Sequence, residues 1–378
     1  MIATPVTAAF VHGVAELEET GGRLRVHRLP GWARTQFPDP QLLMMQTQPS
    51  GARLVMTTAA RTVELTVQPT RIAYRGAGRP RGSIDLVVDG ELLANDELTG
   101  GDTVEIDMAT GETEVHAGPP HTTVFTGLPG GAKLVEVWLP HNETVDLVGL
   151  RTDEPVRAAE PAGPIWLHHG SSISQGSAAT APTGIWPVVA ARRGGVELRN
   201  LGFGGSAIVD QFTARVMRDA PADLISVKLG INVVNIDAMR LRAFVPAVHG
   251  FLDTIRDGHP DTPLVLISPI FCAIHEDTPG PGGFDPERFE FFATGDPAEQ
   301  RRGALTLRVI RGALAELAGR RAHDTRLHYL DGTTLYGEKD AAEQPLPDAL
   351  HPDGATHRLI GERFADYAFA AGGPFSPH

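Results

Sequence analysis

The sequence predicts a chain in two parts, an all-β region followed by an α/β region with a mostly parallel sheet. Three observations support this prediction. Apolar and polar residues alternate early in the chain, and the spacing of the apolar residues changes after residue 163. Beyond that point, short apolar runs alternate with longer segments that have a helical spacing of apolar residues. At 378 residues the chain is longer than one core usually serves. We expect an accessory domain over 1–150, a linker over 151–163 and a second domain over 164–378.

The first region has the pattern of short strands with one buried face. Asp89-Gly90 lies between two apolar runs and predicts a tight hairpin, and "MATGETEV" predicts another. No helical period is visible over 1–150, so we expect a sandwich or jelly roll. The alternating apolar positions are Val63, Leu65 and Val67, then Val104, Ile106 and Met108, then Val135, Val137 and Leu139.

The segment 151–163 is rich in proline, alanine and charge, as linkers are. After it, strand-like and helix-like runs alternate, which predicts a parallel sheet covered by helices on both faces. The apolar runs are Pro164–Leu167, Val196–Leu201, Leu224–Leu229, Leu264–Ile270 and Leu327–Leu330. The helical stripes are Phe244, Val248, Phe251, Leu252 and Ile255, then Leu307, Ile310, Leu314 and Leu317, then Ile360, Phe364 and Tyr367.

Composition narrows the functional classes. The chain is 42% hydrophobic and 21% charged, an ordinary globular balance, and its formal charge of −13 argues against nucleic acid and anionic membrane as partners. The single cysteine, Cys272, excludes an internal disulfide and fits a reducing compartment. No signal peptide and no membrane span is visible, so we expect a cytoplasmic protein.

Four strand ends carry polar residues, and ligands of parallel sheets bind at that edge. They read "HHGSSISQG", "NLGFGG", "LGINVVN" and "DALHPDG". Together they offer a hydroxyl, a histidine, a carboxylate and amide donors, which acyl transfer through a serine requires. His351 is the candidate base and Asp348 the group that orients it. The Gly205 N–H, the Asn232 side chain and the Ser172 N–H, near a helix start, are candidate donors to an oxyanion.

These segments, in this order, resemble the SGNH or GDSL-type hydrolase family over about 164–370. The resemblance identifies Ser172 as nucleophile, and it implies a flavodoxin-like three-layer α/β/α domain with a five-stranded parallel sheet. The all-β region resembles the jelly-roll-like domain of two-domain members, which include carbohydrate esterases and polyketide-tailoring acyltransferases. The matching blocks are Gly170-Ser171-Ser172-Ile173, Gly205 in "NLGFGG", Gly230-Ile231-Asn232-Val233 and Asp348-Ala349-Leu350-His351.

Two positions depart from the family pattern: Ser171 and Val233 each replace an aspartate. Neither position carries a chemical step, so the departures affect positioning. Three other interpretations compete. Ser172 alone would fit a helix cap, "GFGGSA" at 202–207 matches a weak dinucleotide fingerprint, and the altered blocks would suit a non-catalytic carbohydrate or ligand binder. No G-x-S-x-G surrounds Ser172, so an α/β-hydrolase elbow is not supported.

The histidines outside the blocks predict no metal site. His168 and His169 are strand neighbours and face opposite sides, so at most one faces the site, and we assign His169 to substrate binding. His275-Glu276 and His323 lack metal-ligand spacing. His357 is expected to be exposed on the last helix, and Asp353 to cap that helix. The sequence therefore implies neither a metal nor another cofactor.

A long insert over 271–297, rich in proline, glycine and phenylalanine, predicts either a lid or a packed surface loop. As a lid it would present Phe284, Phe289, Phe291 or Phe292 to the substrate. The whole pattern predicts a serine ester hydrolase, with an acyltransferase using the same triad on a small-molecule ester or thioester as the alternative. No feature of the sequence indicates the oligomeric state or the acyl group.

Overall fold

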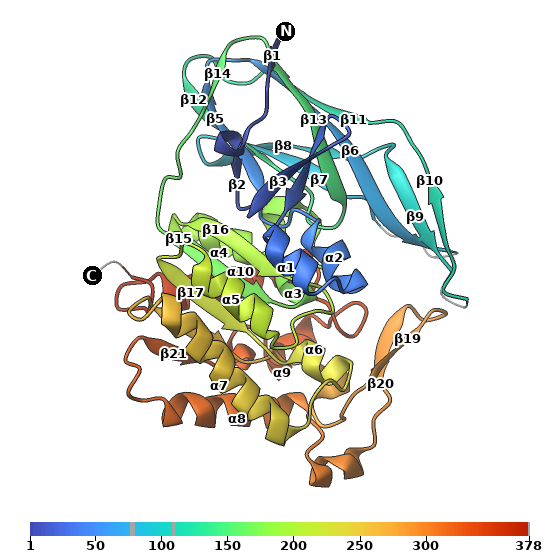
Figure 1. Ribbon diagram of the computed structural model, residues 1–378, viewed down its shortest axis with the longest axis vertical. Helices are drawn as coiled ribbons and strands as arrows, with labels where there is room; N and C mark the ends of the chain where they lie inside the picture. Colours follow the sequence, from blue (N-terminus) through green and yellow to red (C-terminus); the bar gives the residue numbers. More distant parts are fainter. Residues whose placement is uncertain (76–79, 108–109, 377–378) are drawn as a thin grey trace. The chain divides into compact units, whose positions relative to one another are not determined.

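The computed structural model describes residues 1–75, 80–107 and 110–376. The chain forms two compact units. The β unit comprises Met1–Gly31, Leu43–Ala162 and Ala181–Thr183, and the α/β unit comprises Trp32–Leu42, Gly163–Thr180 and Gly184–His378. Figure 1 shows strands dominating the first and alternating strands and helices in the second.

Over its described residues, the β unit contains two sheets. In the first, the order is β10-β9-β6-β13-β4-β3, with β1 beside β13 and β11 beside β6. Its strands are β1 (Ile2–Thr4), β3 (Glu16–Thr20), β4 (Arg23–His27), β6 (Thr62–Tyr74), β9 (Asp102–Ile106), β10 (Thr113–His116), β11 (His121–Thr126) and β13 (Thr144–Thr152). In the second, the order is β14-β5-β12-β7-β8, with β2 beside β5. Its strands are β2 (Val11–His12), β5 (Arg53–Thr58), β7 (Ser83–Val88), β8 (Glu91–Glu97), β12 (Lys133–Trp138) and β14 (Val156–Ala158).

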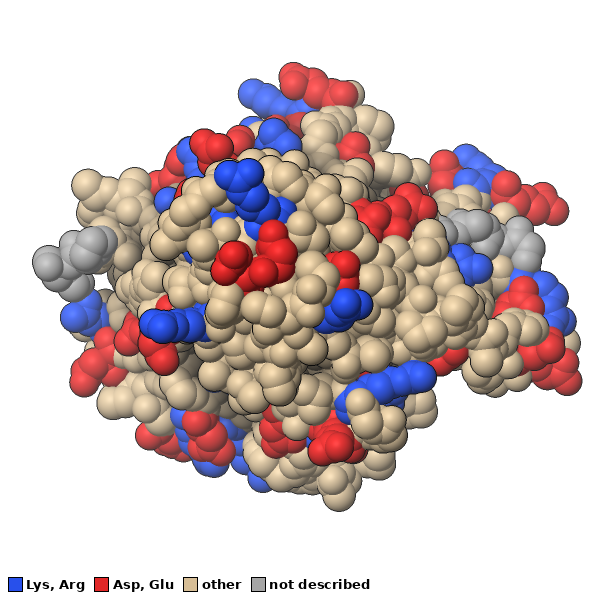
Figure 2. Space-filling view, turned by 90° about the horizontal axis from the view of Figure 1, so that it is seen from above, with Lys and Arg blue, Asp and Glu red and all other residues tan. Residues whose placement is uncertain are grey.

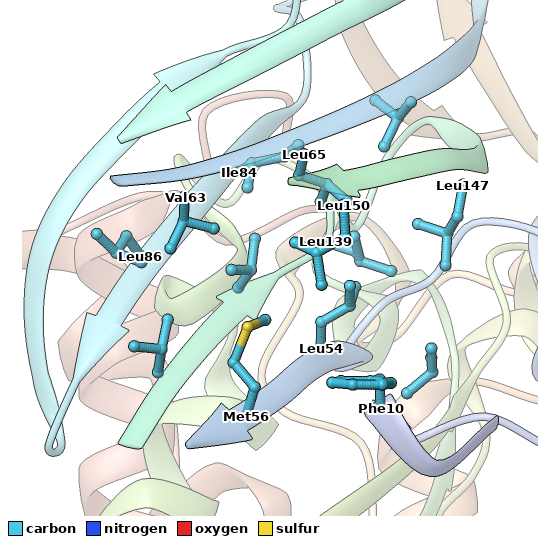
Figure 3. Close-up of a cluster of buried hydrophobic side chains, with 14 of the residues drawn as sticks. Phe10, Leu54, Met56, Val63, Leu65, Ile84, Leu86, Leu139, Leu147 and Leu150 are labelled. Atoms are coloured by element: carbon cyan, nitrogen blue, oxygen red, sulfur yellow. The ribbon is translucent and has the colours of Figure 1, made fainter. Parts of the chain in front are cut away.

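Both sheets contribute to one apolar core, as the alternation predicts. Val63 and Leu65 of β6 meet Leu54 and Met56 of β5 in this cluster (Figure 3), and their alternate neighbours face away from it. The β7–β8 hairpin turns at Asp89 and Gly90, which both have positive φ, as a type I′ turn requires. The β9–β10 hairpin also forms, although Met108 lies outside the described residues.

The α/β unit is built on a parallel sheet in the order β16-β15-β17-β18-β21, which confirms the predicted fold class. Its strands are β15 (Ile165–Gly170), β16 (Glu197–Gly202), β17 (Leu224–Lys228), β18 (Leu264–Ile267) and β21 (Leu327–Leu330). Its helices are α3 (Ser172–Gln175), α4 (Trp186–Gly194), α5 (Gln211–Asp219), α6 (Ile231–Asn235), α7 (Leu241–Gly258), α8 (Leu307–Arg320), α9 (Glu338–Glu343) and α10 (Gly354–Ala368).

Helices cover both faces of this sheet. On one face, Trp166 of β15 stacks on Phe364 of α10 and contacts Trp186 of α4. On the other, His169 of β15 stacks on Phe251 of α7, and α5 and α8 pack beside α7. The short 3-10 helices of the chain are η1 (Ala8–Phe10), η2 (Pro182–Gly184), η3 (Ala273–His275), η4 (Pro297–Arg302) and η5 (Gly332–Thr334).

The units differ from the boundaries that composition suggests. Two helices, α1 (Gly31–Gln36) and α2 (Pro40–Gln46), interrupt the β region where the sequence showed no helical period. They have six and seven residues, too few to show one. Trp32–Leu42 groups with the α/β unit because Phe37 stacks on Phe212. The expected linker is partly strand, since β13 ends at Thr152 and β14 pairs with β5.

The core of the β unit predicts a contrast between two leucine truncations. Leu65→Ala removes a fully buried side chain and should lower the free energy of unfolding by about 2–5 kcal/mol. Leu92→Ala, at a position 50% exposed in the same unit, should change it by less than about 0.5 kcal/mol. Urea unfolding followed through the transition of the β unit measures both. Equal shifts would contradict the assignment of this core.

Candidate active site

Three strand ends converge because β15, β16 and β17 are adjacent and parallel. Parallel strands end at the same edge of a sheet, so the residues that follow each strand become neighbours. The backbone ties two of these ends together directly, since the Phe203 N–H after β16 donates to the Gly170 carbonyl at the end of β15 (2.8 Å). The predicted cluster of polar residues therefore forms at this edge.

Ser172 opens the short helix α3, directly after β15. Ser171 is the N-cap: its side chain accepts a hydrogen bond from the Ile173 N–H (3.3 Å). The capping role that competed for Ser172 thus belongs to Ser171, which replaces the aspartate of the family pattern. The sequence predicts a helix dipole at the Ser172 N–H. Because α3 has only four residues, a single helical turn contributes to that dipole.

The side chains of Ser172, His351 and Asp348 lie in one hydrogen-bonded row. Ser172 Oγ is 3.0 Å from His351 Nε2, and His351 Nδ1 is 2.7 Å from Asp348 Oδ2. Asp348 Oδ1 accepts the backbone N–H groups of Leu350 (3.0 Å) and His351 (2.6 Å). Burial by itself would raise the pKa of the Asp348 carboxyl, but hydrogen bonds and the charge of His351 outweigh it and lower that pKa.

The predicted amide donors are Gly205, in the turn after β16, and Asn232, in α6 after β17. The Asn232 Oδ1 accepts the Ala207 N–H (3.0 Å), which fixes the side-chain amide. Its Nδ2 makes no hydrogen bond to any other residue that the structure describes, so this N–H group is free to donate. Gly205 has a φ of 72°, and the carbonyl of Gly204 accepts Gln41 Nε2 (2.9 Å). Gln41, 163 positions upstream, carries no sequence signal for this contact.

Gly230 fixes the turn that precedes Asn232. Its φ is 127°, a conformation that only glycine adopts readily. A Cβ here would lie 2.7 Å from Pro269 Cγ and 2.8 Å from Ile310 Cγ2, so the site also has no room for a side chain. Val233, which replaces the second aspartate of the family pattern, is fully buried in α6. Val233 therefore contributes apolar packing at this position.

Neither histidine of the "HH" pair lies at the triad. His168 is buried and bonds Ser226 Oγ (2.7 Å) and Ser174 Oγ (2.8 Å). His169 is buried on the opposite face, where its Nδ1 bonds the Leu201 carbonyl (2.8 Å), and burial lowers its pKa to about 4. The assignment of His169 to substrate binding is thus corrected: it is a core residue.

His357 is also buried rather than exposed, contrary to expectation. Its Nε2 lies 3.0 Å from the Ser177 carbonyl, and its Nδ1 accepts the Trp186 N–H (3.3 Å). Burial lowers its pKa to about 4. Asp353 caps α10 as predicted, accepting the Thr356 N–H at 2.8 Å. The imidazole of His357 therefore joins α10 to α4 instead of facing water.

The insert over 271–297 contains an antiparallel hairpin, β19 (Gly282–Asp285) and β20 (Glu290–Ala293). Its aromatic rings form a row: Phe289 contacts Phe284, Phe284 contacts Phe291, and Phe291 contacts the His351 ring at 5.5 Å. Phe289 and Phe292 are 47% and 45% exposed. Of the predicted phenylalanines, Phe291 is the one that contacts the triad, and a lid function stays a prediction.

Among the described residues, one group could geometrically hold a metal ion: Glu105, Glu114 and His116 of the β unit. It is largely exposed, and the Arg75 guanidinium lies 3.8 Å from Glu105 and 3.9 Å from Glu114. A cation thus already balances these carboxylates. Figure 2 shows basic and acidic side chains interspersed on the face drawn. Within the described ranges, no helix is long and apolar enough to cross a membrane.

The α/β unit has the fold of the SGNH hydrolases. Residues 169–359, just over half of the chain, match the GDSL-like lipase/acylhydrolase family. The chain belongs to this family and is an enzyme of the GDSL esterase or acyltransferase type. A comparison with curated proteins finds no match.

Several solved structures resemble this chain over most of its length. The salicylyl-acyltransferase SsfX3 of a tetracycline biosynthetic pathway is 26% identical with a TM-score of 0.78, covering 95% of this chain and 94% of its own. A putative GDSL-like lipase from Bacteroides ovatus is 18% identical with a TM-score of 0.63, covering 94% and 93%. A family two carbohydrate esterase from Clostridium thermocellum is 15% identical with a TM-score of 0.56, covering 91% and 97%.

The buried histidines predict acid sensitivity. His169 and His357 have folded pKa values of about 4, below their ordinary 6.5, so the unfolded chain binds more protons between these values. Their contribution is complete above pH 6.5 and is lost as pH falls to 4, by about 3 kcal/mol each. The free energy of unfolding, measured from pH 7 to 4, should fall less steeply in His357→Gln than in the wild type. An identical slope would contradict the neutral, buried imidazole.

Proposed function

We propose that the protein cleaves acyl esters through an acyl-enzyme formed on Ser172. The observation that carries this proposal is the row of hydrogen bonds from Ser172 Oγ to His351 Nε2 (3.0 Å) and from His351 Nδ1 to Asp348 (2.7 Å). A serine hydroxyl is a weak nucleophile, and a base within hydrogen-bond reach activates it by accepting its proton. The carboxylate keeps the proton of the imidazole on Nδ1 and leaves Nε2 free to accept.

In the first step, Ser172 Oγ attacks the carbonyl carbon of the ester while its proton passes to His351 Nε2. The carbonyl oxygen becomes an anion, for which the Gly205 N–H, the Ser172 N–H and the Asn232 Nδ2 are the donors. When the intermediate collapses, the bond to the alcohol oxygen breaks, and His351 returns the proton to that oxygen. Ser172 then carries the acyl group as an ester.

In the second step, water takes the place of the alcohol. His351 removes a proton from the water, which attacks the acyl carbon and forms a second tetrahedral anion held by the same donors. Breaking the bond to Ser172 Oγ releases the acid and returns the proton from His351 to the serine. Asp348 stays ionised throughout, which its lowered pKa favours.

Removing the nucleophile tests the proposal. Ser172→Ala should reduce the hydrolysis of p-nitrophenyl acetate by on the order of 10⁴-fold or more, because no other hydroxyl among the described residues hydrogen-bonds to His351 Nε2. Mass spectrometry of quenched wild-type protein should find the acetyl group on the peptide that holds Ser172. Equal rates in the two proteins would reject the nucleophile and favour a non-catalytic binder.

Ser171→Ala is the matched control, because it removes a neighbouring hydroxyl that caps α3. It should cost about 1 kcal/mol of stability, while the acetyl adduct on Ser172 still forms. If the adduct disappears in Ser171→Ala but persists in Ser172→Ala, the nucleophile is Ser171 and the assignment of Ser172 is wrong.

A second candidate function is acyl transfer to an alcohol. The likeness to the acyltransferase SsfX3 favours it, with 26% identity over 95% of this chain. The chemistry to the acyl-serine is shared; only the second acceptor differs, and a hydroxyl that binds beside His351 would have to outcompete water. The donor would be a thioester, whose thiol leaves in the first step.

The two functions predict different products from one thioester. With the N-acetylcysteamine thioester of salicylic acid, a hydrolase releases thiol and acid at a ratio of one to one, whatever alcohol is present. A transferase forms an ester at the expense of the acid once an acceptor alcohol is added. Chromatography of the products over a panel of phenolic, sugar and aliphatic alcohols measures this partition, and Ser172→Ala should abolish both products.

A further inference from the structure

The turn that carries the triad acid and base contains an unfavourable backbone conformation. Ala349, between Asp348 and His351, has a φ of 63°, in the left-handed region that residues with a Cβ rarely adopt. A turn of this kind persists only where surrounding contacts determine it. Local bonds contribute, since the Ala349 N–H donates to the Leu346 carbonyl (3.0 Å) and Asp348 Oδ1 accepts two amides of the turn.

Two donors distant in sequence hold the peptide groups on either side of Ala349. The Phe291 N–H donates to the Asp348 carbonyl (2.9 Å), and the Cys272 thiol donates to the Ala349 carbonyl (3.3 Å). The first carbonyl belongs to the peptide before the Ala349 Cα and the second to the peptide after it. Fixing both peptide planes fixes both φ and ψ of this residue.

The ring of Phe291 adds a contact to the imidazole itself. It meets the His351 ring edge to face, with centroids 5.5 Å apart and planes at 76°. One residue of β20 thus holds the turn through its amide and the base through its side chain. Both donors come from the insert over 271–297, which the strand-end motifs do not include.

The beginning of the insert is itself anchored. The Cys272 N–H donates to Glu276 (3.1 Å), and the buried Glu276 forms an ion pair with the partly buried Arg311 of α8. The Phe271 N–H donates to the Tyr336 carbonyl (2.9 Å). Cys272 is itself buried, and burial raises the pKa of its thiol to about 12, so the sulfur keeps the proton that it donates.

We infer that Cys272 and Phe291 are positioning residues that hold the Asp348–His351 turn in its left-handed form and so place His351 Nε2 against Ser172. This inference rests on the proposed function of His351 as the base. Neither residue bonds the amide donors, so their loss should act on the rate of the chemical step and leave the binding of substrate largely intact.

The side chain of Cys272 gives the sharper test, because one substitution keeps a hydrogen-bond donor and another removes it. Cys272→Ser keeps a donor to the Ala349 carbonyl and should keep kcat near the wild-type value. Cys272→Val loses the donor, and a base displaced by about 1 Å can cost on the order of 10²-fold in rate, so kcat should fall with KM little changed. Equal kcat in the two folded variants would overturn the role of the thiol.

Phe291→Ala should also lower kcat, and adding Ala349→Gly should restore part of the loss, because glycine adopts the left-handed turn without a Cβ penalty. Arg288→Ala is the control: this residue of the same hairpin has a side chain 72% exposed whose described ion pair is to Glu290. It should leave kcat unchanged. If Phe291→Ala does not fold, Phe291→Leu replaces it, with the same expectation of rescue. A folded variant with wild-type kcat would overturn the inference for Phe291.

A readout without substrate separates this inference from the proposed function. The His351 Nδ1 proton, shared with Asp348, should give a low-field NMR signal in the wild type and in Cys272→Ser. The signal should broaden or shift in Cys272→Val and Phe291→Ala. An inactive wild type whose signal still responds in this way would reject the ester chemistry and keep the positioning role. An unchanged signal in both variants would overturn the positioning role whatever the activity.

Discussion

The hydrogen bond between Ser172 and His351 requires the α/β unit to bring these two side chains within reach of each other. Its partners are 179 positions apart, so only the fold brings them together. The parallel sheet meets this demand because β15 delivers Ser172 to its carboxyl edge and α10 begins just after His351. The amide donors follow from the same geometry, since β16 and β17 flank β15 and end at the same edge.

Beneath this edge, a buried polar network supports the turn that carries Ser172. His168 bonds Ser226 of β17 on one side and Ser174 of α3 on the other, and the Trp166 indole N–H also donates to Ser226 (2.9 Å). Asn200 adds a bond from β16 to the Ser174 carbonyl (2.8 Å). A polar network in the core is stabilising only when its members are paired. Here the pairing fixes α3 against three strands, and the nucleophile lies on that helix.

The sequence predicts those parts of the site that short-range chemistry determines. Gly230 is required by its own φ, and the Asp348–His351 spacing lets one turn hold both groups. Alternation in β6 and the apolar stripe in α7 each follow from a single repeating period. These features can be predicted from the sequence because a few neighbouring residues are sufficient to specify them.

What the sequence could not predict depends on contacts between distant residues. His169 and His357 carry no local sign of burial, and each is placed by partners such as Leu201 and Trp186. Short helices such as α1 lack the length to show a period, so their grouping with the α/β unit follows only from packing. Cys272 is likewise only a lone thiol in the sequence, and the structure alone shows its hydrogen bond to the Ala349 carbonyl.

The insert over 271–297 illustrates why a catalytic turn can tolerate an unfavourable residue. A glycine at position 349 would adopt the left-handed form at little cost, but it would also allow many others. Alanine narrows the choice of conformations and relies on Cys272 and Phe291 to select the right one. The placement of the base is then coupled to a segment that lies outside the strand-end motifs. Changes in that hairpin can therefore alter the rate of the chemistry while the triad residues stay the same.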